Sequence, residues 1–183
     1  MKDKPVKIST EQRLPTGPQS KPAMTRGERN VDAIKLLKAD HREVAELIEE
    51  FEEADHDEKA GLARQICTAL TVHAQIEEEI LYPEAREALD EEDRELVNEA
   101  DVEHASVKQL VAEIEAASPD DEHFDARVKV VGEYVRHHVK EEEKELFRKL
   151  EDTDLDLDEI GARLAARKAE LMAQQPGEAP AAH

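Results

Sequence analysis

Apolar residues recur at intervals of three and four along four long stretches of this sequence, a spacing that places them on one face of an α-helix. The first stretch begins near Asn30, a residue type suited to capping a helix, and ends around residues 55–57. The other stretches run over about 58–88, 93–116 and 121–150, and acidic or Pro-containing segments separate them. The pattern therefore predicts four amphipathic helices.

A fifth, shorter amphipathic segment covers about 156–173, and we expect it to pack across the preceding helices. Four helices of similar length with short turns predict an all-α fold, an antiparallel up-down-up-down four-helix bundle. The chain then divides into a disordered N-terminal arm (1–28), the bundle (29–152) and a C-terminal part (153–183) with the short helix and a loose tail. Inside the second helix, Pro83 lacks an N–H and is expected to kink or break it.

Polar residues interrupt the middle of each apolar stripe. Each of the four helices carries one His at a position where Leu would be expected, and two of the helices add a Glu four residues after the His, on the same face. Counting residues from the predicted turns places the four His within about one or two helical turns of a single level. The residues concerned are His41, His73, Glu77, His104, His138 and Glu142.

This combination indicates a metal site in the bundle core. A single inward His, or a Glu four residues after a His, is common in proteins without a metal, but burying two unpartnered carboxylates would cost several kcal/mol each. A cation at the centre removes that cost by taking the side chains as ligands. Cys67 is the single cysteine, so no thiolate site and no internal disulfide is expected. Six nitrogen and oxygen ligands exceed what one tetrahedral zinc needs and suit a pair of iron ions, although manganese or zinc would fit the same ligands.

The negative charge of the chain limits the kinds of partner that it is expected to bind. The 183 residues carry 46 acidic against 25 basic side chains, a formal net charge of −21. So acidic a surface repels nucleic-acid phosphates and anionic lipid, so we expect neither as a partner. The chain has no apolar run long enough to span a membrane and no signal-peptide pattern at its start, which predicts a cytoplasmic protein.

The sequence resembles the hemerythrin-like family, also called the HHE cation-binding domain, over about residues 31–150. The resemblance rests on order, spacing and the aromatic residue after each His and Glu pair. The motifs are Asp40-His41, His73 with Glu77 and the following Ile80-Leu81-Tyr82-Pro83, Glu103-His104, and His138 with Glu142 and the following Glu145-Leu146-Phe147.

The resemblance implies a non-haem di-iron centre. By analogy with the family, Glu77 and Glu142 would bridge the irons, with His41 and His73 on one iron and His104 and His138 on the other. It also implies a small-molecule ligand, because family members bind or sense O2, act on NO or peroxide, or handle iron. Tyr82 and Phe147 are expected to pack in the core beside the site.

One position departs from the family pattern. Hemerythrins that carry O2 have a second His four residues after the one on the third helix, and here that residue is Lys108. A protonated Lys is a poor ligand. Water, or a carboxylate such as Glu103 or Glu145, could take the place, and a more open iron would favour peroxide or redox chemistry over plain O2 carriage.

One assignment and the function remain open at this point. His137 and Glu141 share the spacing of His138 and Glu142, and the apolar stripe of the helix favours the second pair as the inward one. The leading hypothesis is a di-iron protein that binds or senses O2, NO or peroxide, or handles iron. The alternatives are a di-iron enzyme that removes peroxide or NO, and a metal-stabilised interaction module in which the helix at 156–173 could serve a partner.

Overall fold

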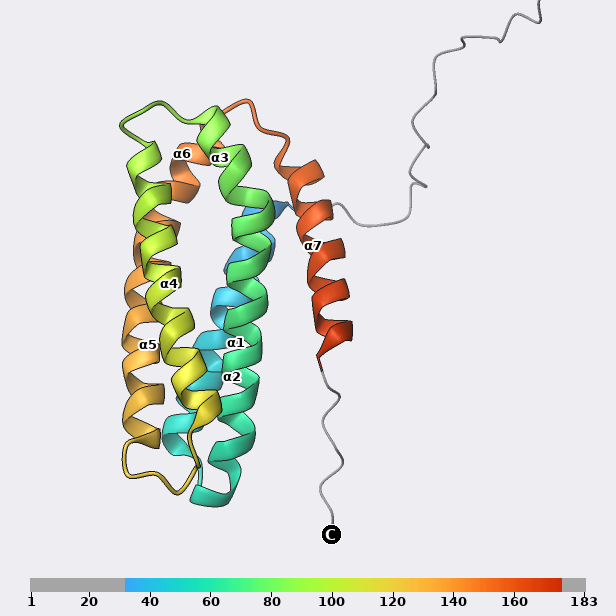
Figure 1. The fold of residues 1–183 in the computed structure, drawn as a ribbon. Helices are drawn as coiled ribbons and strands as arrows, with labels where there is room; N and C mark the ends of the chain where they lie inside the picture. The colour runs from blue at the N-terminus through green and yellow to red at the C-terminus, as the bar shows by residue number, and fades with distance from the viewer. Residues whose placement is uncertain (1–31, 176–183) are drawn as a thin grey trace, which may run out of the picture.

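The computed structural model describes residues 32–175, and these residues form helices and no strands. Four long helices make the body of the molecule (Figure 1). They are α1 (Ala33–Glu53), α2 (His56–Ile76), α4 (Arg94–Ala116) and α5 (Phe124–Glu141). Each runs antiparallel to the one before it, so the predicted up-down-up-down bundle is confirmed. The arm predicted at 1–28 and the last eight residues, 176–183, lie outside the described residues.

The first helix begins slightly later than the sequence indicated. Asp32 is its N-cap, and one carboxylate oxygen accepts a hydrogen bond from the backbone N–H of Lys35 at 3.0 Å. An Asp in this position satisfies one of the free N–H groups at a helix start. The cap expected at Asn30 lies outside the described residues.

Two short π-helical segments continue α2 and α5 without a break in the chain. They are η1 (Glu77–Leu81) and η2 (Glu142–Leu146), followed by α3 (Tyr82–Ala88) and α6 (Phe147–Glu151). The expected disturbance at Pro83 is therefore a π turn that precedes the proline, which itself lies in the first turn of α3. Because η2 has no proline after it, proline alone does not cause these turns.

The π turns bring an aromatic side chain to each inward Glu. In η1 the backbone N–H of Tyr82 donates to the carbonyl of Glu77, and in η2 that of Phe147 donates to Glu142. An α-helix closes its hydrogen bonds over four residues, so residues five apart diverge, whereas a π turn closes over five and stacks them. Tyr82 and Phe147 are consequently buried, as predicted for core residues.

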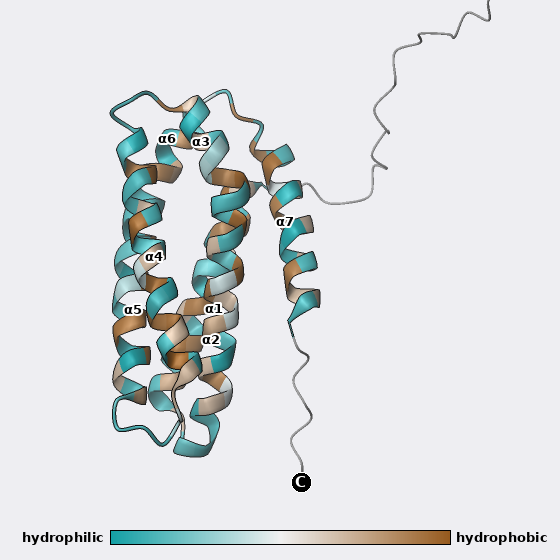
Figure 2. Cartoon of the chain, viewed as in Figure 1, coloured by the Kyte–Doolittle hydropathy of each residue, from teal (hydrophilic) through white to brown (hydrophobic). Residues whose placement is uncertain are grey.

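The apolar core is divided into two clusters, one on each side of a polar layer. One cluster includes Ile34, Leu37, Ile76, Val97 and Leu150, and the other includes Val44, Ile48, Ile66, Val111 and Val131. Figure 2 shows apolar and polar residues alternating along each helix, as amphipathic helices require. The buried His and Glu residues fill the layer between the clusters.

The C-terminal helix α7 (Leu157–Gln174) lies along the outside of the bundle, beside α1 and α2 (Figure 1). It buries Ile160, Leu164 and Leu171 against the first apolar cluster. Its basic residues also pair with acidic residues of the bundle, as Arg163 does with Glu84 at 2.6 Å. The expectation that this segment packs across the bundle is confirmed.

Candidate metal centre

All six predicted ligand residues meet at one level inside the bundle. Each is at most 6% exposed, and Glu77 is fully buried. α1, α2, α4 and α5 each contribute one His, while the two π segments contribute the Glu residues at their first positions. The inward position of the four His, inferred from the apolar stripes, is therefore confirmed, whereas their role as ligands is a question of chemistry.

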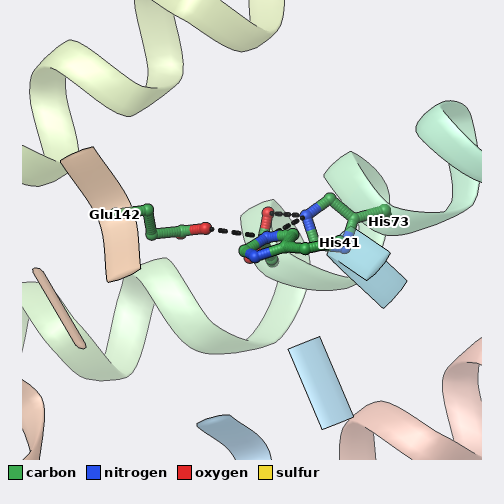
Figure 3. Close-up of side chains that lie close together, drawn as sticks. His41, His73 and Glu142 are labelled. Atoms are coloured by element: carbon green, nitrogen blue, oxygen red, sulfur yellow. Dashed lines mark hydrogen bonds and ion pairs between the residues drawn. The ribbon is translucent and has the colours of Figure 1, made fainter. Parts of the chain in front are cut away.

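The four His form two pairs. The Nε2 atoms of His41 and His73 are 3.2 Å apart, and those of His104 and His138 are also 3.2 Å apart. Both pairs turn the same ring nitrogen toward the centre. Figure 3 shows the first pair with Glu142 pointing at it from η2. The pairing is the one that the family resemblance implied for two neighbouring metal ions.

Each Glu lies between one His of each pair. An oxygen of Glu77 is 3.2 Å from Nε2 of His73 and 3.4 Å from Nε2 of His104. An oxygen of Glu142 is 3.3 Å from Nε2 of His41 and 3.6 Å from Nε2 of His138. Two groups of possible ligand atoms result, each with its members within 4.8 Å of one another: His41, His73, Glu77 and Glu142, and Glu77, His104 and His138. Glu77 belongs to both groups, as a bridging carboxylate would.

The protein atoms do not satisfy these two carboxylates. Both oxygens of Glu77 and one of Glu142 have no hydrogen-bond partner within residues 32–175. Burial and the neighbouring Glu142 raise the pKa of Glu77 well above its usual value. Burial also opposes ionisation of Glu142, but the neighbouring imidazoles of His41, His138 and His73 outweigh it and lower its pKa to about 2.

Burial favours the neutral form of two of the four imidazoles, whereas the neighbouring Glu142 and Glu143 outweigh burial and raise the pKa of His41. Burial, together with the neighbouring His138 and His73, lowers the pKa of His104 to about 3, so its ring stays neutral at pH 7. Burial likewise lowers the pKa of His73. Neutral imidazoles and carboxylates with free lone pairs are the forms that bind metal ions. The donor set therefore fits a buried cation.

A second layer of carboxylates faces the outer nitrogen, Nδ1, of every His. The side chain that serves each His comes from the preceding helical segment along the chain, and the last segment closes the ring onto the first. The pairs are Asp40 with His73 at 3.8 Å, Glu78 with His104 at 3.1 Å, Glu103 with His138 at 2.8 Å, and Glu143 with His41 at 2.9 Å. Such partners fix the tautomer and the orientation of a metal-binding His.

These outer carboxylates occupy regular positions in the sequence, next to an inward His or Glu. The many other acidic residues of the chain make this pattern hard to recognise. Asp40 and Glu103 directly precede an inward His, while Glu78 and Glu143 directly follow an inward Glu. In helices so rich in Glu, acidic residues such as Glu78 and Glu143 ordinarily lie on solvated faces. They are instead partly exposed and paired with buried His residues, because a residue beside an inward ligand points toward the neighbouring helix.

The two aromatic residues after the Glu ligands differ in one functional group. The ring of Tyr82 lies 5.4 Å from the ring of His104, and that of Phe147 lies parallel to His41 at 5.9 Å. Only the tyrosine adds a hydroxyl, which is 3.3 Å from Nε2 of His104 and donates to Glu142 at 3.3 Å. Burial raises the pKa of this hydroxyl well above its ordinary value, so it remains a proton donor.

Lys108 does not enter the centre. Its side chain is 44% exposed and donates to Glu78 at 2.6 Å, so it stabilises the carboxylate that faces His104. The two carboxylates considered for the vacant ligand position also lie elsewhere, since Glu103 binds the outer nitrogen of His138 and Glu145 is exposed. The hydroxyl of Tyr82 lies on the inner side, 3.3 Å from Nε2 of His104.

The alternative pair on α5 lies at the surface. His137 is 61% exposed, with Nε2 3.4 Å from Glu141 and 3.6 Å from Glu103. These three residues form an open cluster, while His138 and Glu142 are buried at the centre. The preference for His138 and Glu142 as the inward pair is confirmed.

A small apolar cavity adjoins the four His residues. Its volume is about 20 Å³, which holds roughly one water-sized molecule. Its other walls come from the second apolar cluster and include Val44, Leu70, Val107 and Val135.

The fold and the buried cluster define a helical-bundle protein of the cation-binding class. The family model described as "Hemerythrin HHE cation binding domain" matches residues 32–150. The chain therefore belongs to the hemerythrin HHE cation-binding domain family, which confirms the resemblance seen in the sequence. Among the described residues, no helix combines the length and the hydropathy needed to cross a membrane.

Two proteins show similarity to the chain. A solved structure of a hemerythrin HHE cation binding domain-containing protein from Mycobacterium kansasii matches with a TM-score of 0.66 and 23% identity, over 78% of this chain and 88% of that one. A DNA nickase from Nostoc sp. is 33% identical over 129 residues, which make up 68% of this chain but 36% of the relative. The chain thus spans about a third of that relative's length.

Proposed function

We propose that the protein binds two iron ions between its four helices and uses them to bind or sense a small molecule such as O2, NO or peroxide. The observation that carries the proposal is the unsatisfied pair of buried carboxylates surrounded by four inward imidazoles. His41 and His73 would hold one ion, His104 and His138 the other, with Glu77 and Glu142 between them. Manganese or zinc would suit the same donors.

Two features support the binding of a small molecule: the number of protein ligands and the cavity beside the His residues. Four imidazoles and two shared carboxylates leave positions free on a pair of six-coordinate ions. Lys108 points away from the centre, so no fifth imidazole fills one of them. The apolar cavity beside the His residues would accept a molecule of about the size of water. Iron bound here would supply redox chemistry and exchangeable ligand positions.

The test is to purify the protein without oxygen, count the metals per chain and record the absorption spectrum before and after admitting air. About two irons and a charge-transfer band that appears in air and fades on deoxygenation would support reversible O2 binding. Irons that oxidise without return would support peroxide, NO or iron handling. Alanine variants of His73 and Glu77 should lose metal, and unchanged metal content in both would refute the proposed ligand set.

An enzymatic role is the second candidate, because an open position on the metal allows turnover as well as binding. Here the iron-loaded protein should remove added peroxide or NO catalytically, and the metal-free protein should not. A stoichiometric reaction that stops after one equivalent would restrict the protein to binding or sensing. The Tyr82 hydroxyl, which is buried and remains protonated, is a proton donor within 3.3 Å of the centre.

Nicking of DNA, the activity named for the Nostoc relative, is a weaker candidate for this chain. The net charge of −21 opposes approach to a phosphate backbone. Conversion of supercoiled plasmid to the open circle by the iron-loaded protein, lost in the His73→Ala variant, would support it. The third candidate, a module whose metal only stabilises the fold, predicts that metal removal unfolds the bundle and that no gas or oxidant changes its spectrum.

A further inference from the structure

The outer carboxylate of His73 differs from the other three. Asp40 is itself buried, and its oxygen Oδ2 lies 3.8 Å from Nδ1 of His73, whereas the other three outer contacts are between 2.8 and 3.1 Å. Both atoms of this longer contact lack a hydrogen-bond partner within residues 32–175. A small shift of Asp40 would therefore make or break its contact with Nδ1 of His73.

Asp40 is held by a residue from outside the four-helix bundle. Lys168 on α7 donates to its other oxygen, Oδ1, at 2.8 Å. A carboxylate that is held on one oxygen by a Lys keeps a fixed orientation, whereas one without this contact is free to rotate. Lys168 thus determines whether Asp40 presents an acceptor to His73.

The contact between Lys168 and Asp40 can form and break without unfolding the bundle. Lys168 is 29% exposed, and both it and Asp40 border a groove of about 600 Å³ between α1, α2 and α7. Glu43 lies 3.5 Å from the same ammonium group and offers it a second, more exposed partner. By contrast, Lys108, which holds the outer carboxylate of His104, belongs to the bundle itself.

We propose that α7 contributes to the metal centre, because Lys168 acts through Asp40 as the positioning residue for His73. The helix lies beyond residues 32–150, the part that the family model matches, so it adds a contact to the centre that the bundle alone does not provide. The half of the centre formed by His41 and His73 would then retain its ion only while α7 is docked. This inference rests on the proposed metal site.

Lys168→Met tests the proposal, with Arg163→Met as the matched control. Arg163 makes the same kind of ion pair from the same helix, to Glu84, which does not face any His of the centre. After loading with iron, each variant is challenged with a chelator and the metal remaining is counted over time. Loss of an outer partner lowers metal affinity 10–100-fold, so Lys168→Met should release one of two ions about tenfold faster. Lys168→Arg should stay within about twofold of the unaltered protein.

A double variant separates positioning from packing. Asp40→Asn should speed release as Lys168→Met does, and the two changes together should add nothing, because Lys168 acts through Asp40. Additive effects, equal release by Arg163→Met, or unchanged release by Lys168→Met would overturn the proposal. Thermal unfolding of each variant shows whether it is folded during the assay.

A metal-free readout keeps this test distinct from that of the proposed function. Long-range ¹H–¹⁵N spectra show which ring nitrogen of His73 carries the proton. In the unaltered metal-free protein it should be Nδ1, facing Asp40, and in Lys168→Met the two tautomers should mix. If the protein holds no metal yet shows this change, the metal function fails and the positioning stands. If it holds two metals and His73 does not respond, the positioning by α7 fails alone.

Discussion

Replacing Glu77 by Gln should make the metal-free protein more stable. Glu77 is fully buried, neither of its oxygens has a hydrogen-bond partner among the described residues, and burial beside Glu142 raises its pKa well above 4.5. A carboxyl group whose pKa is higher in the folded protein than in the unfolded chain destabilises the fold at pH values above its unfolded pKa. Gln imitates the neutral form and removes that cost.

The size of the effect is that of burying a polar group without a hydrogen-bond partner, about 1–3 kcal/mol. Its pH dependence follows from the direction of the pKa shift, which is upward from 4.5. A raised carboxyl pKa destabilises above the unfolded pKa, and this destabilisation disappears as the pH falls to that value. The gain from Glu77→Gln should therefore be present at pH 7 and should shrink as the pH falls toward 4.5.

Urea unfolding of the metal-free proteins, with a chelator present, measures this difference. The control is Glu145→Gln, an exposed carboxylate in the other π segment, which should change stability by less than about 0.5 kcal/mol. Added iron should stabilise the unaltered protein and leave Glu77→Gln nearly unaffected. A metal-free Glu77→Gln variant that is no more stable at pH 7, or whose gain persists at pH 4.5, would refute the reasoning.

Four further substitutions test other parts of the structure. His138→Ala should reduce metal content while His137→Ala leaves it unchanged, because only the first is buried at the centre; elemental analysis of both decides this. Tyr82→Phe should keep the metal content but shift the absorption spectrum, because it removes the hydroxyl beside His104; an identical spectrum would exclude a role for that group. Leu164→Ala should cost about 2–5 kcal/mol of unfolding free energy, since the side chain of Leu164 on α7 is fully buried against the bundle; a smaller cost would mean that α7 docks loosely.

The bundle and its inward residues could be predicted from periodicity alone. A helical stripe shows both which residues are buried and which polar residues break the pattern, and short turns fix the antiparallel order. His41, His73, His104 and His138 could therefore be placed at one level by counting residues. The same stripe also separated His138 from its neighbour His137, because only one of the two continues the apolar face.

The outer carboxylates and the π turns could not be predicted in the same way. Glu78 and Glu143 look like any other acidic residue in a Glu-rich helix, and their contacts depend on how neighbouring helices are rotated about their axes. A π turn adds one residue to a helical turn and leaves the composition unchanged. In the sequence, the π turns correspond to the five-residue spacing from Glu77 to Tyr82 and from Glu142 to Phe147.

The centre is built from two similar halves that are not equivalent. Each half has an acid before one His, an acid after one Glu, and a π turn that carries an aromatic ring over the His. The half with His104 adds the Tyr82 hydroxyl and an outer carboxylate held by Lys108 within the bundle. The half with His41 has Phe147 in the place of the tyrosine, and its outer carboxylate, Asp40, is held by Lys168 of α7. Two metal ions in such a site would differ in hydrogen bonding and in retention, which favours a centre with one reactive and one adjustable ion over a symmetric carrier.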